Sequence, residues 1–121
     1  MRELQRHPVP TIGDELRERA ETLRENKFWW INGEPDRQQR MCAVFTFVDG
    51  RARAVLSQRA QTALMEWLPK YLQERYPGVW ATFVADGHGP LMYSITDFND
   101  CVANDVDDVI TMLEKAAADI G

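Results

Sequence analysis

Residues 57–76 carry the longest helical pattern of the chain, and it begins Ser57-Gln-Arg-Ala60-Gln-Thr-Ala-Leu64-Met-Glu-Trp67-Leu68-Pro69-Lys-Tyr71-Leu72. Its apolar residues recur at the spacing that places side chains on one face of a helix. Ser57 is a suitable N-cap, and Pro77-Gly78 is expected to end the helix. Pro69 lacks a backbone N–H, so it should kink or split the helix. This segment therefore predicts a long helix with one face against the core.

A further helical pattern lies toward each end of the chain. The first runs from Thr11 to about Asn26, where apolar residues at helical spacing alternate with acidic and basic ones. The last has Asn104 as its N-cap and acidic residues in its first turn, which the helix dipole favours. Its core-facing positions are Val106, Val109, Ile110, Leu113 and Ala117. Residues 1–10 are predicted to form an extended N-terminal arm, followed by a single α+β domain over residues 11–121.

The sequence between the first and second predicted helices has the composition of β-strands. Lys27–Ile31 is aromatic and ends in a β-branched residue. Met41–Val48 is apolar at both odd and even positions, which predicts a central strand buried on both faces. Asp49-Gly50 is a two-residue hairpin turn, and Arg51–Leu56 is the returning strand.

A second hairpin is predicted between the long helix and the last one. Val79–Ala85 and Leu91–Phe98 are its strands, on either side of the loop Asp86-Gly-His88-Gly-Pro90. Together these elements predict an α+β fold. It would consist of an antiparallel β-sheet of four to five strands with three helices, in the order α-ββ(β)-α-ββ-α.

Charge is unevenly distributed along the chain. The net charge is −5, and residues 61–121 carry ten acidic and three basic residues, whereas residues 1–60 have a balance of +2. A strongly acidic half attracts basic partners and repels nucleic acid and anionic membranes. The N-terminus lacks the apolar run of a signal peptide, and the two cysteines do not make a disulfide framework. We therefore expect a cytoplasmic protein with no nucleic-acid or membrane partner.

Cys42, Cys101, His7 and His88 are the candidates for a nucleophile and its base. Cys42 lies in the most apolar predicted strand, where burial makes a thiol less reactive. In the predicted second hairpin, His88 and Cys101 lie at opposite ends, about 30 Å apart at roughly 3.3 Å per residue. The glycine-rich residues 86–90 lack the lysine and the following helix of nucleotide-binding loops. We therefore expect no catalytic residue and no enzyme activity.

Acidic and amide side chains are concentrated between Asp97 and Asp108. The segment begins in the register of a calcium-binding loop, but Cys101 interrupts that register and no central glycine follows. Capping of the last helix accounts for the acidic residues that begin at Asp105. We therefore expect no metal and no cofactor, while Asp97 and Asp100 are left over for contact with a partner.

Trp29 and Trp30 are adjacent in a predicted strand, so their side chains should face opposite sides of the sheet. One is expected to lie in the core, and the N-terminal helix is available to cover the other. Left uncovered, a tryptophan beside Phe28 would be a natural interface anchor.

Two known families have similar patterns. The predicted element order, small size and acidic balance resemble those of the type III secretion chaperones, which implies a protein that carries another protein. The segment Tyr93-Ser-Ile-Thr-Asp-Phe-Asn-Asp-Cys-Val102, followed by a helix, is similar to the strand-loop-helix of HicB-type antitoxins, although the Pro-Gly-Cys turn of that family is missing. Neither resemblance supplies site residues.

These observations predict a non-enzymatic protein-binding module that masks or carries a basic partner protein. Inhibitors, immunity proteins, anti-defence proteins and secretion chaperones act in this way, and an acidic surface would speed their association. The expected contact residues are Asp97, Asp100, Asp105, Asp108 and His88, with Trp29 or Trp30 as the apolar anchor.

Two other functions are open at this point. A small enzyme or ligand-binding domain would have its pocket near His88 and the acidic cluster at 97–108, between the sheet and the helix kinked at Pro69. A self-associating protein would form a homodimer through the Trp29-Trp30 strand or the last hairpin. A deep pocket lined by titratable groups would favour the first of these, whereas a flat acidic face would favour protein binding.

Overall fold

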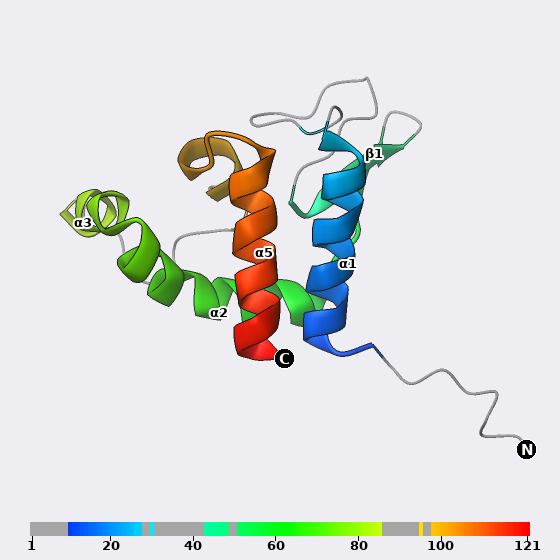
Figure 1. Ribbon diagram of the computed structural model, residues 1–121, viewed down its shortest axis with the longest axis horizontal. Coiled ribbons are helices and arrows are strands. Elements are labelled where there is room, and N and C mark those ends of the chain that lie inside the picture. The colour runs from blue at the N-terminus through cyan, green and yellow to red at the C-terminus, as the bar shows by residue number, and fades with distance from the viewer. Residues whose placement is uncertain (1–9, 28–29, 31–42, 49–50, 86–94, 96–97) are drawn as a thin grey trace, which may run out of the picture.

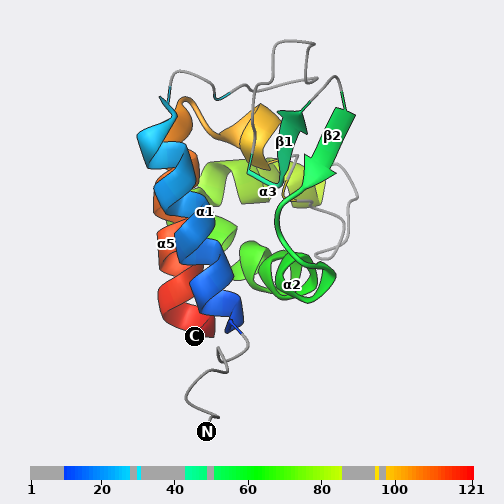
Figure 2. The same cartoon turned by 90° about the vertical axis from the view of Figure 1, so that its right-hand side faces the viewer.

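Three helices pack against one another to form the core of the molecule (Figure 1). They are α1 (Ile12–Glu25), α2 (Gln58–Arg75) and α5 (Val106–Ile120). The computed structural model describes residues 10–27, 30, 43–48, 51–85, 95 and 98–121. Helices α1 and α5 lie side by side in opposite directions, and α2 contacts both of them (Figures 1 and 2).

The other described elements are helix α3 (Pro77–Ala85), the π-helix η3 (Phe98–Val102) and a β-hairpin. The hairpin pairs β1 (Phe45–Val48) with β2 (Arg51–Ala54) in antiparallel orientation. The order along the chain is α1-β1-β2-α2-α3-η3-α5. Within these described ranges, no helix is both long and apolar enough to cross a bilayer.

The most extensive contact between elements joins α1 to α5. At one end of this contact the Gly13 N–H donates to the carbonyl oxygen of Gly121 at 3.2 Å. A Cβ atom at Gly13 would lie only 2.6 Å from the Gly121 carbonyl carbon. The missing side chain at Gly13 is therefore what allows the start of α1 to approach the end of α5 so closely.

Side-chain caps fix the first residues of α1 and α2. The Thr11 hydroxyl accepts from the Asp14 N–H at 3.0 Å, and the Asp14 carboxylate accepts from the Thr11 N–H at 3.1 Å, forming a capping box. Ser57 caps α2 by accepting from the Ala60 N–H at 3.2 Å. The predicted helices from Thr11 to about Asn26 and over 57–76 are therefore confirmed.

The last helix is also confirmed, but its predicted N-cap is wrong by one residue. Asp105 is the N-cap, and its carboxylate accepts from the Asp108 N–H at 3.2 Å. The Asn104 N–H instead donates to the Asp108 carboxylate at 2.8 Å. Two carboxylates thus satisfy backbone donors at the positive end of the helix dipole. The five apolar positions predicted for this helix are all buried.

Helix α2 crosses the α1–α5 pair with a strongly apolar face. Leu64, Leu68 and Leu72 are each 0% exposed. Pro69 is also buried, and α2 continues through it as one helix, so the predicted split does not occur. The burial of these side chains offsets the backbone hydrogen bond that the proline removes.

The predicted α+β fold is wrong. The described part of the chain is mainly helical, and the sheet found there contains β1 and β2 rather than four to five strands. Met41–Val48 is not a central strand, because β1 pairs with β2 alone among the described residues. The apolar character of that segment has another cause: Ala43 and Val44, at 0% and 2% exposed, belong to the core before the strand begins. The resemblance to secretion chaperones rested on the predicted element order and falls with it.

The predicted second hairpin is wrong as well, because Val79–Ala85 belongs to helix α3. Pro77 stands in the first turn of this helix, where its missing N–H is not needed. The Trp80 N–H then donates to the Tyr76 carbonyl at 3.0 Å, which starts the helix directly after α2. A short apolar run without alternation cannot distinguish a strand from a helix. Most of the second predicted strand, Leu91–Phe98, lies outside the described residues.

Other predicted segments cannot be compared with the structure. The N-terminal arm, apart from Pro10, and most of Lys27–Ile31 lie outside the described residues. Trp30 is described, and it is half-buried against the core.

A buried polar cluster, which we call the Asn99 cluster, joins η3 to α1 and to the segment before β1. Asn99 is 0% exposed, and its Oδ1 accepts from Trp30 Nε1 at 2.8 Å and from the Ala43 N–H at 3.1 Å. Arg19 of α1 is 4% exposed and donates through Nε to the Ala43 carbonyl at 3.1 Å. Buried polar groups are tolerated when they are hydrogen-bonded in this way. The cluster therefore fixes how these three segments lie relative to one another.

The valines of α5 and α3 provide a direct test of this core. Val109 is 0% exposed, whereas Val84 is 48% exposed. We expect Val109→Ala to lower the free energy of unfolding by about 2 kcal/mol, since it leaves a cavity in the core. Val84→Ala should change it by about 0.5 kcal/mol or less. Urea unfolding followed by circular dichroism measures both, and equal effects would contradict the described packing.

A second test concerns the Asn99 cluster. Asn99→Ala removes the acceptor of the buried Ala43 N–H and of the half-buried Trp30 indole N–H, so we expect the free energy of unfolding to fall by about 2–3 kcal/mol. Asn104→Ala is the matched control, because Asn104 is exposed and its backbone N–H keeps its bond to Asp108. Denaturant unfolding of the two variants should differ clearly. A stability of Asn99→Ala close to that of the unsubstituted protein would show that the cluster is not structural.

Candidate functional site

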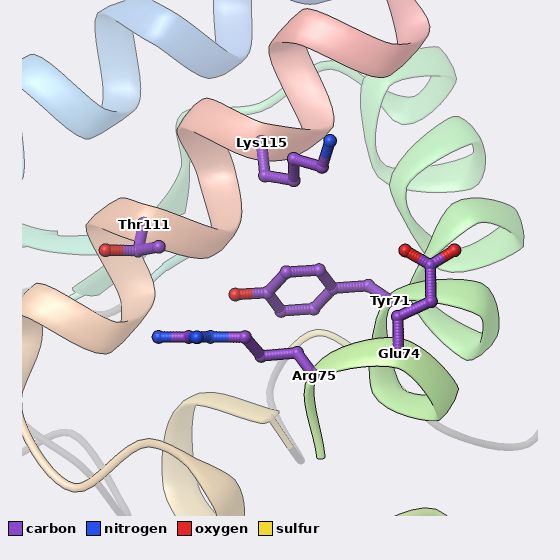
Figure 3. A pocket seen from close by; sticks show the side chains of 5 residues that line it. All are labelled: Tyr71, Glu74, Arg75, Thr111 and Lys115. Atoms are coloured by element: carbon purple, nitrogen blue, oxygen red, sulfur yellow. The ribbon is translucent and has the colours of Figure 1, made fainter. Parts of the chain in front are cut away.

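An open cavity lies between the C-terminal half of α2 and the middle of α5 (Figure 3). Its volume is about 450 Å³. It is lined by Tyr71, Glu74 and Arg75 from α2 and by Thr111 and Lys115 from α5. Small-molecule sites typically have volumes of roughly 300–1,000 Å³ and a few converging polar groups on an apolar surface. This cavity has both properties.

Another hollow, of about 340 Å³, lies on the surface of α2. Its described lining comes from that one helix and consists of Gln58, Thr62, Met65 and Glu66. The described part of this lining therefore does not enclose a ligand from two sides. The cavity between α2 and α5 is therefore the better candidate site.

The polar groups of the cavity are arranged in two sets around the Tyr71 ring (Figure 3). In this view the Tyr71 hydroxyl, the Thr111 side chain and the Arg75 guanidinium lie toward one end. Glu74 lies toward the other end, and Lys115 extends along the α5 side with its ammonium group in that direction. One end therefore carries the Arg75 guanidinium, and the Glu74 carboxylate and the Lys115 ammonium lie toward the other.

Aromatic packing holds the Tyr71 ring in place. Trp67 stacks against it, with ring centroids 4.8 Å apart and an interplanar angle of 22°. Tyr76 meets it edge-on at 6.0 Å, and Phe98 lies 6.1 Å away at 57°. Such aromatic pairs fix ring orientation as well as bury area. The hydroxyl at the end of this ring is consequently held in a defined position.

The Tyr71 hydroxyl is buried and has no hydrogen-bond partner among the described residues. Its side chain is 5% exposed. Burial is the main cause that raises the pKa of Tyr71, and Arg75 acts in the opposite direction both through its charge and as a hydrogen-bond donor to the phenolate. An unsatisfied buried hydroxyl costs about 1–3 kcal/mol. The hydroxyl is covered by protein atoms, so it is not open to a ligand in the cavity.

Asp119 connects the two helices beside the cavity. Its carboxylate accepts from Trp67 Nε1 at 2.9 Å and lies 3.3 Å from Lys115 Nζ. The hydrogen bond from Trp67 is the main cause that lowers the pKa of Asp119, and Lys115 adds to the effect. Asp119 thereby positions the tryptophan that stacks on Tyr71 and restrains the lysine that lines the cavity.

Helix α3 presents a different kind of surface, which we call the α3 face, formed by Val79, Trp80, Phe83 and Val84. The helix contains no charged residue, and none of its residues is buried. Val79 is 36% and Val84 is 48% exposed, and the Trp80 and Phe83 rings lie 5.8 Å apart. Figure 1 shows α3 at the end of α2, on the opposite side of α5 from α1. An exposed apolar helix of this kind is typical of an interaction surface.

The structure describes some of the predicted contact residues. Asp105 is exposed and caps α5, and Asp108 is half-buried and takes part in the same cap. Trp30 is half-buried, with its indole N–H bonded inside the Asn99 cluster. Asp100 belongs to η3, but its side chain lies outside the description, as do Asp97, His88 and Trp29 altogether. Asp105 and Asp108 are thus close together at the start of α5, and both serve as capping groups.

The predicted separation of about 30 Å between His88 and Cys101 assumed straight strands in the second hairpin. The first of those strands is helix α3, but His88 and most of Leu91–Phe98 lie outside the described residues, so the distance itself stays a prediction. His7, Cys42 and His88 lie outside the described residues. In the part of the chain that is described, no three His, Cys, Asp or Glu side chains form a group suited to a metal ion.

Sequence reasoning missed both surfaces. The helical spacing predicts that Tyr71 is a core residue, and its ring does lie in the core. Its hydroxyl is a buried polar atom without a hydrogen-bond partner among the described residues. Arg75 and Lys115 stand forty residues apart in the sequence, and only the crossing of α2 and α5 brings them to one cavity. A weak signal for the α3 face is present in the sequence, because seven residues without a charge, Val79–Ala85, follow the Pro-Gly pair. The apolar composition of this run predicts a strand instead.

The buried Tyr71 hydroxyl predicts a loss of stability in alkali. Unfolded tyrosine ionises near pH 10, and burial raises the pKa of Tyr71 above that value. The stability that protonated Tyr71 contributes is fully present below about pH 10. It is lost as the pH rises through the pKa of the folded protein, because the unfolded chain then binds fewer protons. We expect Tyr71→Phe to make the alkaline fall in the free energy of unfolding shallower. Urea unfolding over a pH series measures this, and parallel pH profiles for the two proteins would contradict it.

Comparisons with known proteins place the chain in a family but supply no activity. Residues 7–119 match a family of unknown function, DUF6197. No curated protein and no solved structure shows a significant match. The match covers nearly all of the chain, so the protein belongs to the DUF6197 family.

Proposed function

We propose that this member of the DUF6197 family is a non-enzymatic protein-binding module that masks or carries a basic partner protein. The observation that carries the proposal is the α3 face: a helix of apolar composition in which no residue is buried. The acidic balance of the chain supports the choice of a basic partner. We place its action in the cytoplasm, where a chain with two cysteines and no disulfide framework is stable.

The α3 face has the composition of an interface core. Trp and Phe side chains are common anchors, because they bury a large apolar area with few rotatable bonds. Trp80 and Phe83 are half-buried, so a partner would cover only the part still exposed and gain less than the roughly 1.5–3 kcal/mol of a fully exposed side chain. Trp80 and Phe83 already pack partly against the core, so their positions are restrained before a partner binds. We therefore assign the role of apolar anchor to Trp80 and Phe83, in place of Trp29 or Trp30.

Electrostatics favour a basic partner at this end of the molecule. Burial is the main cause that raises the pKa of Tyr76, Asp108 and Asp105 add to the effect, and Arg75 acts in the opposite direction. These carboxylates therefore act on the residue that immediately precedes α3. Their side of the molecule combines an apolar helix with nearby negative charge. An amphipathic basic segment has the complementary combination, and the opposite charges would speed association.

Two alternatives to protein binding remain as outcomes to test. A small enzyme or ligand-binding domain centred on His88 and the acidic residues 97–108 would bind a small molecule there. The cavity between α2 and α5 is lined by other residues, so it is not the pocket predicted near His88. A homodimer through the α3 face would make the partner a second copy of the chain. Light scattering at several protein concentrations detects that outcome directly.

The α3 face yields a test with a matched control. We expect the combined variant Trp80→Ser, Phe83→Ser to lose a basic protein that the unsubstituted chain retains from a lysate of its source or host. Val55→Ser is the control, because Val55 is 44% exposed and lies outside α3. Mass spectrometry identifies the retained protein, and surface plasmon resonance with that purified protein gives its association and dissociation rates. The serine pair should raise the dissociation rate at least tenfold, whereas Val55→Ser should leave it unchanged.

Removing negative charge tests the electrostatic part of the proposal separately. Asp105→Ser keeps a good N-cap while it removes one charge, so stability should be preserved. Combined with Asp97→Asn and Asp100→Asn, it should slow association several-fold and flatten the dependence of the association rate on salt. Unchanged association kinetics would remove the acidic residues from the interface. Retention that is equal for the serine pair and for Val55→Ser would overturn the role of the α3 face.

A further inference from the structure

We infer that the α3 face binds its partner as a short amphipathic α-helix, whose apolar stripe packs on α3 and whose flanking side chains are basic. The inference rests on the proposed function, because it uses the same surface. It goes further by naming the form of the segment that α3 recognises, so that a helix is distinguished from a strand, an extended loop or a second copy of the chain.

The first argument is that α3 is apolar on every side. At about 100° per residue, the four side chains of the α3 face span an arc of about 140° around the helix. The rest of the circumference carries small residues, all of them exposed: Gly78, Ala81, Thr82 and Ala85. Helices that are apolar all round are normally covered by other elements. Helix α3 contains no charged residue and no buried one, so it lacks such a cover on the side away from the core.

The second argument is the shape of the α3 face. Val79 and Phe83 are four residues apart and form one ridge, and Trp80 and Val84 form the next ridge beside it. The groove between two such ridges accepts a ridge of another helix, at a crossing angle near −50° and about 8–10 Å between the axes. The backbone groups of α3 are bonded within the helix, so α3 offers no edge to which a strand could be added. Its surface therefore fits a helix better than a strand.

The third argument is the charge of the sequence around α3. Between Arg75 and Lys115 there is no lysine and no arginine, while seven residues of that stretch are acidic. Helix α3 lies near the beginning of the stretch, and η3 and the start of α5 follow later in it. Figures 1 and 2 both show η3 next to α3. An apolar helix set in an acidic stretch is complementary to an apolar stripe flanked by lysine or arginine.

The described acidic residues divide between two roles. Asp107 lies 2.8 Å from Lys27, so its charge is offset inside the molecule. Asp105 and Asp108 lie on the side toward α3, because after burial their charges are what raises the pKa of Tyr76, the residue before α3. Arg75 offsets part of this negative charge. The remaining charge at the start of α3 attracts a cationic segment.

The same charges disfavour a second copy of the chain as the occupant. Two α3 faces packed on each other would bring two such acidic stretches together, and their repulsion would oppose the contact. A basic helix gains attraction in the same place. The nine residues of α3 extend over about 13 Å at roughly 1.5 Å per residue, so two to three turns of the partner helix are enough to cover it.

Three synthetic peptides of about 15 residues test the inference with the full chain. The first has leucine at helical spacing and lysine elsewhere, the second has the same leucines with glutamate, and the third is a scrambled form of the first without helical periodicity. We expect the first to bind at least tenfold more tightly than either of the others, as measured by fluorescence anisotropy. Circular dichroism should show that it gains helix on binding.

A pair of lysine substitutions locates the binding surface. Val84→Lys places a positive charge on the α3 face, whereas Val55→Lys makes the same change outside α3. The two valines are 48% and 44% exposed, so both variants should fold. We expect Val84→Lys to weaken binding of the first peptide at least tenfold and Val55→Lys to change it less than twofold.

Several outcomes would overturn the inference. Equal binding of the lysine and glutamate peptides would remove the basic character of the partner, and equal binding of the periodic and scrambled peptides would remove its helical form. Failure of all three peptides to bind, or equal effects of Val84→Lys and Val55→Lys, would also contradict it. Light scattering that shows a dimer lost in Val84→Lys would make a second copy the occupant.

The failure of this inference can be told from the failure of the proposed function. A basic protein that is retained from the lysate through Trp80 and Phe83, while the three peptides bind equally, would leave the proposed function standing and remove the helical partner. A lysate in which retention of no basic protein depends on Trp80 and Phe83 would contradict the proposed function itself.

Discussion

The packing of α1 against α5 is the contact on which the other parts of the structure depend. Gly13 lets the start of α1 approach the backbone of Gly121, and the helices then run in opposite directions with their leucines between them. Because α5 buries this face, its remaining sides are available to α2 and to solvent. Thr111 and Lys115 lie on the side that lines the cavity. The orientation of α5 therefore decides both where the core lies and what the cavity contains.

Two buried polar groups show how differently such groups can be used. Asn99 is fully buried and accepts two hydrogen bonds, so it adds to the rigidity of the fold. Tyr71 is nearly as buried, but its hydroxyl has no partner among the described residues. The first group joins segments of the chain to one another. The second is covered by protein atoms without joining segments in this way, and Arg75 is the charged group that acts on it.

The α3 face and the cavity are chemically opposite, and they follow each other along the chain. Arg75 ends α2 beside the cavity, and Pro77 begins α3. The cavity combines the buried Tyr71 ring with charged side chains at its rim, whereas α3 is uncharged and has no buried residue. A protein partner of the kind we propose would recognise the apolar helix rather than the cavity.

The sequence by itself determined the three packed helices, because their periodic apolar positions and capping residues are local properties. Thr11 and Ser57 are caps that can be identified in the sequence, and the apolar stripe of α5 is buried as its spacing indicates. Only the tertiary structure decided that Val79–Ala85 is a helix, because an apolar run without periodicity fits a strand equally well. It also decided the cavity, since Tyr71 and Thr111 meet only where α2 crosses α5. Contacts between residues far apart in the chain depend on helix packing, which local patterns do not specify.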